Sequence, residues 1–286
     1  MKIAFTAVSG QLGRTIANCA IEKFGRENVI GTARTPEKVK DPGIEVRKAS
    51  YDYQEEFAEA LKGIDVVVLI SGMAAPDQRI IQHRNVIDAA KEAGARKIIY
   101  TSIIGKDGNS TFDAIVQSNR QTEQDILESG LEWAIGRNGL YLEPDIEYLD
   151  NYVKEGKITN CAGDGKCSYT SRDELATAYT SMIGDDSLNG RIYNLAGEAI
   201  TQQQLAELFN EAFSTDLQYV PISVDEYLRF QVEHNGEFLG PIIAGIYQKI
   251  RNGEFDIKSD FEAVTGRAHK SVREICSEGR GIKKAN

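Results

Sequence analysis

Short apolar runs alternate with longer amphipathic stretches through the first half of this chain, and this alternation constrains the fold more than any other feature. The segments are, in chain order, Ile3–Phe5, Leu12–Phe24, Val29–Gly31 and Ile64–Ile70. In Val66–Ile70 apolar residues do not alternate with polar ones, as is typical of a strand covered on both faces. The pattern predicts repeated βαβ units, and therefore a parallel sheet with helices on both sides.

The same rhythm continues to about residue 137. The sequence predicts a helix over Gln78–Ala93 that ends at Gly94, and a strand over Lys97–Ser102. A helix over Phe112–Glu128 and a strand over Leu131–Gly136 follow. This is the order of elements in a Rossmann-type, doubly wound α/β fold. We expect residues 1–137 to form a dinucleotide-binding domain.

Residues 138–286 show a looser pattern, and we expect a smaller, mostly helical lobe with some strands returning to the main sheet. Helical patterns cover Arg172–Met182 and Val224–Ile250, the latter punctuated by Gly236, Gly240 and Pro241, and Arg191–Leu195 is typical of a strand. Thr201, with Gln204 three residues later, is typical of a capping box at the start of another helix.

Composition excludes several classes of function. The chain has 286 residues and a formal net charge of −10, which repels nucleic acid and anionic membrane surfaces. No apolar run approaches the roughly 20 residues of a membrane span, and the amino terminus lacks the apolar stretch of a secretory signal. Its four cysteines show no metal-binding spacing, so unpaired structural thiols are expected. We therefore expect a cytoplasmic monomer or homodimer that acts on a small molecule and holds no metal.

A glycine-containing turn joins the first strand to the first helix. Gly10 and Gly13 would let a diphosphate approach the backbone and let the helix pack close to the sheet. Ala7 occupies the position of the first glycine in the usual Gly-x-x-Gly-x-x-Gly pattern. The residues expected to contact a cofactor at this turn are Thr6, Ser9, Gly10, Gln11 and Leu12.

The end of the second strand indicates which dinucleotide binds. NAD sites usually place an acidic residue there for the ribose hydroxyls, whereas NADP sites place a basic group for the 2′-phosphate. Here the acid is missing, Arg34 is present, and Lys38 lies one helical turn further on. A guanidinium binds phosphate through paired, charge-assisted hydrogen bonds, so these residues favour NADP(H). The competing interpretation of Arg34 is a solvated surface arginine.

Several segments together resemble the NmrA-like atypical short-chain dehydrogenases/reductases, and most of all their branch of triphenylmethane reductase and NAD(P)H:quinone oxidoreductase type 2. They include Gly10–Gly13, Ala33–Arg34, Gly43–Arg47, Gln82–Ala90, Ile99–Ser102, Arg137–Tyr141, Tyr193–Leu195 and Ser259–Gly266. The resemblance implies a Rossmann-fold NADP(H) protein with a small substrate lobe. It places Tyr51 near the adenine, although Ser50 replaces an acidic residue of the relatives, and it implies cofactor contacts at Ile70, Ser71, Gly72 and Asn138.

The proton-transfer pair of ordinary short-chain dehydrogenases is missing. None of the tyrosines has a lysine four residues later, and matching Glu123 to the family puts Asn119 at the lysine position and Ile115 at the tyrosine position. Reduction of a quinone, an enone or a cationic dye needs no such pair, because positioning alone can contribute several kcal/mol. We therefore expect an NADPH-dependent reductase that transfers hydride to a quinone-like or other electron-poor small molecule.

The strand ends should form the acceptor pocket, since open α/β sheets bind ligands at the carboxyl ends of their strands. The resemblance places Ser71, Gly72, Ser102, Asn138, Gly139 and Tyr141 at its rim. From these residues and the strand-five helix, Ser102, Asn119 and Tyr141 are the catalytic candidates.

Less specific interpretations compete with these roles. Asn119 would then be a solvated helix-surface amide, and Tyr141 and Tyr148 would pack the lobe. His83 has no partner acid in the sequence and is interpreted as structural, and Cys19 as part of the core. A non-catalytic regulatory protein that senses NADP(H) is the alternative function, because it too would lack the tyrosine and lysine pair.

Overall fold

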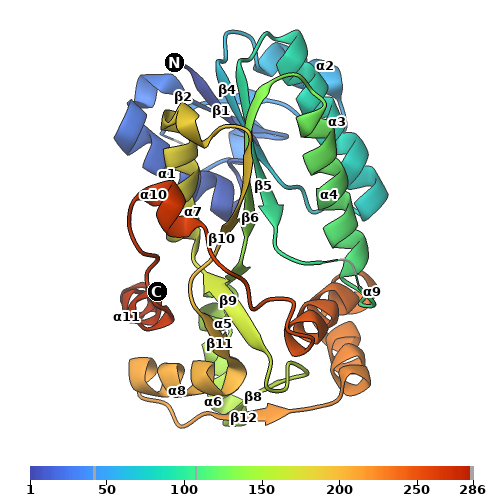
Figure 1. Ribbon diagram of the computed structural model, residues 1–286, viewed down its shortest axis with the longest axis vertical. Coiled ribbons are helices and arrows are strands. Elements are labelled where there is room, and N and C mark those ends of the chain that lie inside the picture. The colour runs from blue at the N-terminus through green and yellow to red at the C-terminus, as the bar shows by residue number, and fades with distance from the viewer. Residues whose placement is uncertain (41–42, 107, 284–286) are drawn as a thin grey trace.

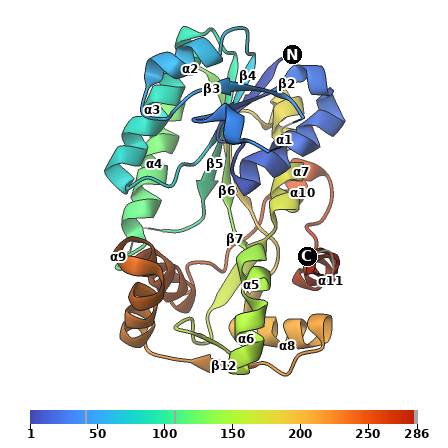
Figure 2. The same cartoon turned by 180° about the vertical axis from the view of Figure 1, so that it is seen from behind.

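A seven-stranded sheet forms the upper half of the molecule in the computed structural model, which describes residues 1–40, 43–106 and 108–283. In order across the sheet (Figure 1 and Figure 2), the strands are β10 (Arg191–Leu195), β6 (Glu132–Asn138), β5 (Lys97–Ile103), β4 (Val66–Ile70), β1 (Ile3–Phe5), β2 (Val29–Ala33) and β3 (Glu45–Lys48). Every neighbouring pair runs parallel, which confirms the predicted parallel sheet.

Helices cover both faces of this sheet. One face carries α2 (Gln54–Ala60), α3 (Pro76–Glu92) and α4 (Asp113–Leu127), and the other carries α1 (Gln11–Phe24) and α7 (Arg172–Gly184). Alternate residues of β4 enter opposite hydrophobic clusters: Val66, Val68 and Ile70 pack on the α1 side, and Val67 and Leu69 on the α2–α4 side. Burial on both faces explains why this run shows no polar alternation.

The lower half of the molecule is a lobe of helices around two small sheets (Figure 2). Its helices are α5 (Glu143–Glu147), α6 (Leu149–Glu155), α8 (Gln202–Phe213), α9 (Val224–Arg251) and α11 (Val272–Lys283), while α10 (Phe261–Thr265) packs against α7. One small sheet joins β11 (Ala199–Thr201), β9 (Lys166–Thr170) and β7 (Leu140–Tyr141), and the other joins β12 (Gln218–Pro221) and β8 (Lys157–Asn160).

The second half of the chain agrees with the sequence in its helices and in the predicted strand Arg191–Leu195, which is β10 of the main sheet, and it adds two small sheets. Thr201 and Gln204 form the predicted capping box of α8. The predicted boundary after Arg137 falls inside β6, α7 and β10 return to the main sheet, and residues 284–286 of the expected lobe lie outside the described part. The small sheets were not predicted, because their short strands mix polar and apolar residues and show neither a continuous apolar run nor a sustained alternation.

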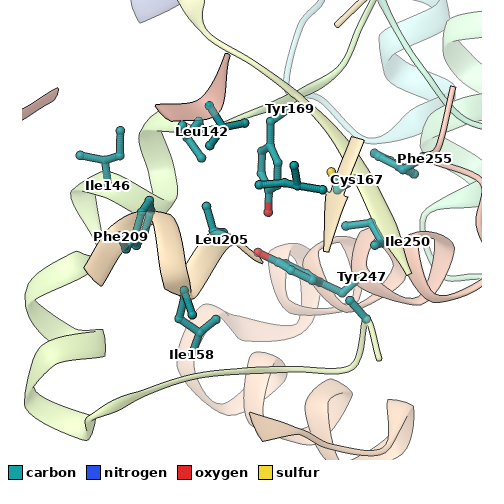
Figure 3. Packing of buried hydrophobic residues seen from close by; sticks show 14 of the residues in the cluster. Leu142, Ile146, Ile158, Cys167, Tyr169, Leu205, Phe209, Tyr247, Ile250 and Phe255 are labelled. Carbon is teal, nitrogen blue, oxygen red and sulfur yellow. The ribbon is translucent and has the colours of Figure 1, made fainter. Parts of the chain in front are cut away.

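A second hydrophobic core holds the lobe together (Figure 3). Tyr169, Leu205, Phe209 and Ile250 are buried in it, so β9, α8 and α9 share one packed interior. Gly236 adopts a left-handed φ of 77° and divides α9 into two helical parts at one of the predicted punctuation points. None of the helices in the described part of the chain is both long and apolar enough to cross a membrane.

Candidate functional site

The turn after β1 has the conformation of a dinucleotide-binding turn although its first glycine is replaced. Ala7 has a φ of 50°, in the left-handed region that glycine favours, and Gly10 N–H donates to the Ala7 carbonyl at 2.9 Å. A Cβ added at Gly13 would lie 2.7 Å from the Ala7 carbonyl oxygen, so only glycine fits where α1 crosses the turn. The turn is therefore retained with alanine at this position, at the cost of a strained backbone conformation at Ala7.

The amino terminus of α1 is open to an anion. This helix has 14 residues, begins after Gly10, and has neither a side-chain cap nor an acidic residue in its first turn. Its first backbone N–H groups and its dipole therefore provide an electropositive end. Ser9, Gly10 and Gln11 are exposed there, and Leu12 is partly exposed.

Arg34 follows β2 beside this turn, and Lys38 lies at the end of a short 3₁₀ segment, Pro36–Lys38. Both side chains are exposed, and neither has an ion-pair or hydrogen-bond partner among the described residues. The predicted pair of basic groups is therefore free to meet a phosphate.

Thr6, Tyr51 and Ile70 tie the ends of β1 and β4 together. The Ile70 N–H donates to Thr6 Oγ1 at 2.8 Å, and Tyr51 Oη lies 2.6 Å from Thr6 Oγ1 and 2.7 Å from the Ile70 carbonyl oxygen. Burial raises the pKa of Tyr51, so its phenol stays protonated. Thr6 is completely buried and Ile70 is buried, so of these three residues only the partly exposed Tyr51 presents surface to a ligand, and the predicted contact at Thr6 has no exposed atoms behind it.

A cavity of about 1000 Å³ opens between the strand ends and the lobe. The sheet side of its lining includes Ser71, Gly72, Asn119, Asn138, Gly139 and Tyr141. Its lobe side is strongly aromatic and aliphatic, with Tyr148, Tyr152, Tyr227, Phe230, Phe238, Ile242 and Tyr247 among its residues. The structure therefore brings the predicted rim residues together, with Ser102 excepted, and their chemical roles stay predictions.

Asn119 is not a solvated amide, and that alternative interpretation is wrong. Asn119 is completely buried (0% exposed). Its Oδ1 accepts a hydrogen bond from Tyr100 Oη at 2.6 Å, and Ser71 Oγ lies 3.3 Å from the same oxygen. Its Nδ2 donates to the Ile115 carbonyl at 2.8 Å. The amide is a fixed hydrogen-bonding group in the cavity lining, and its match to the lysine position of ordinary relatives stays a prediction.

His83 holds the loop after β4. Its Nε2 accepts from Gly72 N–H at 3.0 Å, and its Nδ1 lies 2.9 Å from Thr122 Oγ1, which itself donates to the Ser118 carbonyl. This arrangement assigns the proton to Nδ1. Burial, aided by the positive charge of Arg79, lowers the pKa of His83 to about 3. His83 is thus a neutral structural residue, as expected, although its partner Thr122 was not predicted.

Tyr141 is a phenol of the cavity lining, and one hydrogen bond to its oxygen is described. Asn138 Nδ2 donates to Tyr141 Oη at 2.9 Å, while Asn138 Oδ1 accepts from Tyr179 Oη at 2.6 Å. The described residues offer no acceptor for the hydrogen of Tyr141 itself. Burial raises the pKa of Tyr141 to about 12, so this hydroxyl can donate to a ligand oxygen at neutral pH.

Ser102 lies outside the cavity lining. It is 0% exposed, and its Oγ donates to Glu123 Oε1 at 2.6 Å. Arg120 and Arg137 both pair with the same carboxylate, and Arg120 also binds the carbonyls of Ile103 and Gly105. This network stabilises the junction of β5, β6 and α4. It keeps the buried Ser102 away from a substrate in the cavity, which argues against the predicted catalytic role of Ser102.

Two buried charged residues of the cavity lining were not predicted, in addition to Glu155, Lys157 and Glu226 on its lobe side. Arg79 comes from the first turn of α3, and Asp145 comes from α5. Tyr152 Oη donates to Asp145 Oδ1 at 2.8 Å, and burial raises the pKa of Asp145 to about 6. An arginine or an aspartate in a helix is usually solvated, so the sequence carries no signal for either. Cys19, expected in the core, is only partly buried, and its Sγ lies 3.4 Å from Thr180 Oγ1.

The parallel sheet, the open helix terminus after its first strand and the cavity at its strand ends define a Rossmann-type dinucleotide-binding protein. Such sites place a nucleotide and its reaction partner at the same edge of the sheet. The chain belongs to the NAD(P)H-binding family, whose model matches residues 8–186.

Individual relatives agree with this assignment. Quinone oxidoreductase 2 of Escherichia coli strain K12 is 31% identical over 79% of this chain and 79% of its own length. Triphenylmethane reductase of Citrobacter sp., solved as a complex with NADP(H), superimposes with a TM-score of 0.88 at 27% identity, covering 98% of this chain and 100% of that one. A Staphylococcus aureus protein described as a nucleoside-diphosphate-sugar epimerase gives a TM-score of 0.89 at 27% identity, over 97% and 100% of the two chains. The predicted resemblance is confirmed, and the protein is an NAD(P)H-dependent oxidoreductase.

Proposed function

We propose that this protein is an NADPH-dependent reductase of quinones or of similar electron-poor small molecules. The observation that carries the proposal is a large aromatic cavity at the strand ends, next to a dinucleotide turn that has basic residues beside it. Small-molecule sites usually measure roughly 300–1,000 Å³, so this cavity of about 1000 Å³ has room for a multi-ring acceptor. The coenzyme, when bound, supplies a hydride.

The residues at the turn fit NADPH. The uncapped end of α1 suits a diphosphate, and the close approach at Gly13 keeps the turn compact. Arg34 and Lys38 have no ion-pair partner within the described ranges, on a protein of net charge −10, which supports a role in binding the 2′-phosphate. Two of the relatives support the assignment by name, one as a quinone oxidoreductase and one as a reductase bound to NADP(H).

The cavity residues support reduction of an acceptor that needs little acid catalysis. Tyr141 can donate a hydrogen bond to an acceptor oxygen, but no lysine lies four residues from any tyrosine to lower a phenol pKa. Asn119, which the family resemblance matches to the lysine position, is held by hydrogen bonds of its Oδ1 with Tyr100 and of its Nδ2 with the Ile115 carbonyl. These residues would orient the acceptor and exclude water, which suits a downhill reduction and argues against sugar epimerisation.

Loss of NADPH absorbance in the presence of quinones, triphenylmethane dyes and enones tests this function directly. We expect consumption with at least one quinone and faster turnover with NADPH than with NADH. Tight NADPH binding without consumption by any acceptor would refute the reductase and favour the NADP(H)-sensing alternative. Absence of binding by both coenzymes would refute the cofactor assignment itself.

A further inference from the structure

Arg79 is a buried cation that has no counter-ion among the residues the structure describes. Its residue is only 4% exposed, and the hydrogen bond that its guanidinium makes runs from Nη2 to the Ala74 carbonyl at 3.2 Å. Its Nε is buried and has no partner, and no carboxylate in the described ranges lies within ion-pairing distance. By contrast, the exposed Arg84 on the same helix pairs with Asp125 at 2.8 Å.

Burying an unpaired charge is unfavourable, so an arginine in this position needs an anion to offset its desolvation. Burial already lowers the pKa of Arg79, and its charge contributes to the lowered pKa of His83. The positive charge therefore acts on the floor of the cavity, beside the Gly72 loop that His83 holds.

The position of Arg79 indicates the origin of the anion. Arg79 lines the cavity together with Ser71 and Asn119, whereas the turn at residues 6–13 contributes nothing to the described lining. The diphosphate of a coenzyme on that turn would thus lie outside this space. The other charged side chains of the lining, Asp145, Glu155, Lys157 and Glu226, come from the lower lobe and are mostly acidic, while α3, which carries Arg79, flanks the main sheet (Figure 1). An anionic ligand would therefore place its charged group at the sheet end.

We propose, on the basis of the reductase function above, that Arg79 binds a permanently anionic group, a carboxylate, sulfonate or phosphate, carried by the acceptor. A guanidinium offers parallel N–H donors that match two oxygens of such a group. Arg79 is then the residue that selects acidic acceptors over neutral ones of the same shape.

Binding without turnover tests the inference separately from catalysis. Calorimetry on the NADPH complex compares naphthalene-2-sulfonate with the neutral, similarly shaped naphthalene-2-sulfonamide. We expect the wild type to bind the sulfonate roughly 10- to 100-fold more tightly, as a charge-assisted hydrogen bond allows. Arg79→Gln should remove this preference, and Arg84→Gln, the exposed control on the same helix, should keep it. No preference in the wild type, or a preference that survives Arg79→Gln, would overturn the inference.

A second set of measurements separates this role from structural and cofactor roles. Arg79→Gln should unfold at the same or a higher temperature than the wild type, because it removes an unpaired buried charge. Arg79→Lys, which keeps the charge, should retain part of the sulfonate preference even if the glutamine variant folds poorly. Weaker NADPH affinity in Arg79→Gln, with the sulfonate preference unchanged, would assign the arginine to the coenzyme and overturn the inference.

Turnover then distinguishes the two proposals. In the NADPH assay, 1,4-naphthoquinone-2-sulfonate should have a lower KM than 1,4-naphthoquinone in the wild type only. If neither quinone is reduced while the sulfonate preference in binding persists, the reductase proposal fails and the anion site stands.

Discussion

Asp145→Asn should stabilise the protein at neutral pH while leaving it almost unchanged in acid. The carboxyl group has a pKa of about 6 in the fold against an ordinary value of 3.8, because burial disfavours its ionised form. That difference corresponds to about 3 kcal/mol of unfolding free energy. The groups that face it are neutral phenols, including Tyr152 on α6 and Tyr247 on α9, so no cation offsets the charge.

The sign of the pH dependence follows from proton binding. Between the two pKa values the folded protein holds a proton that the unfolded chain has released, so stability falls as pH rises from about 4 to about 6. Asparagine keeps an acceptor for Tyr152 and does not titrate. The difference in unfolding free energy between the variant and the wild type should therefore be near zero at the acid end and grow to about 3 kcal/mol above pH 7.

Urea unfolding of both proteins at several pH values measures this difference. Asp256→Asn, the same chemical change at an exposed position, is the control and should show no comparable growth with pH. A stability difference for Asp145→Asn that does not change with pH would refute the reasoning, because it would mean that the buried carboxyl titrates as it does in the unfolded chain.

Four further outcomes can be measured. Arg34→Asp should lower the ratio of NADPH to NADH affinity by roughly 100-fold in paired titrations, since a cation on the 2′-phosphate is replaced by an acid; an unchanged ratio would contradict its role. Ala7→Gly should raise stability by about 1 kcal/mol in thermal unfolding by relieving its φ of 50°, and Ser214→Gly, at a φ of 57° far from the turn, should do the same. Gly10→Val should abolish coenzyme binding in calorimetry, and retained micromolar affinity would argue against the turn as the diphosphate site. Tyr141→Phe should lower kcat roughly tenfold with NADPH affinity unchanged, and an equal kcat would exclude its hydroxyl from the reaction.

The fold was predictable where one local pattern decides the structure. A strand buried on both faces, such as Val66–Ile70, shows as a continuous apolar run, and glycines such as Gly94 and Gly130 end the flanking helices with positive φ. The strands of the lobe carry no such signal. β7 has two residues, and its neighbour β9 follows more than twenty residues later in the chain.

The candidate site was predictable to the extent that strand ends determine it. Ser71, Asn138 and Tyr141 follow β4 or lie at the ends of β6 and β7, and they meet because parallel strands end at one edge. The state of each side chain depends on partners distant in sequence. Asn119 is held by contacts from β5 and from the loop after β4, and Arg79 is exceptional only because no acid of the described residues reaches it. The burial of Asn119 and the missing partner of Arg79 are set by tertiary packing, so no residue spacing in the sequence predicts them.

The link from Gly72 through His83 to Thr122 has a consequence for how this enzyme could change its acceptor. It anchors the loop after β4 to two helices of the nucleotide half, so that side of the cavity is a fixed surface. The opposite wall comes largely from α9, whose two parts meet at a glycine and whose Phe230 and Phe238 are partly open to solvent. Substitutions along α9 can therefore change which acceptors bind, while the residues of the nucleotide-binding half stay the same.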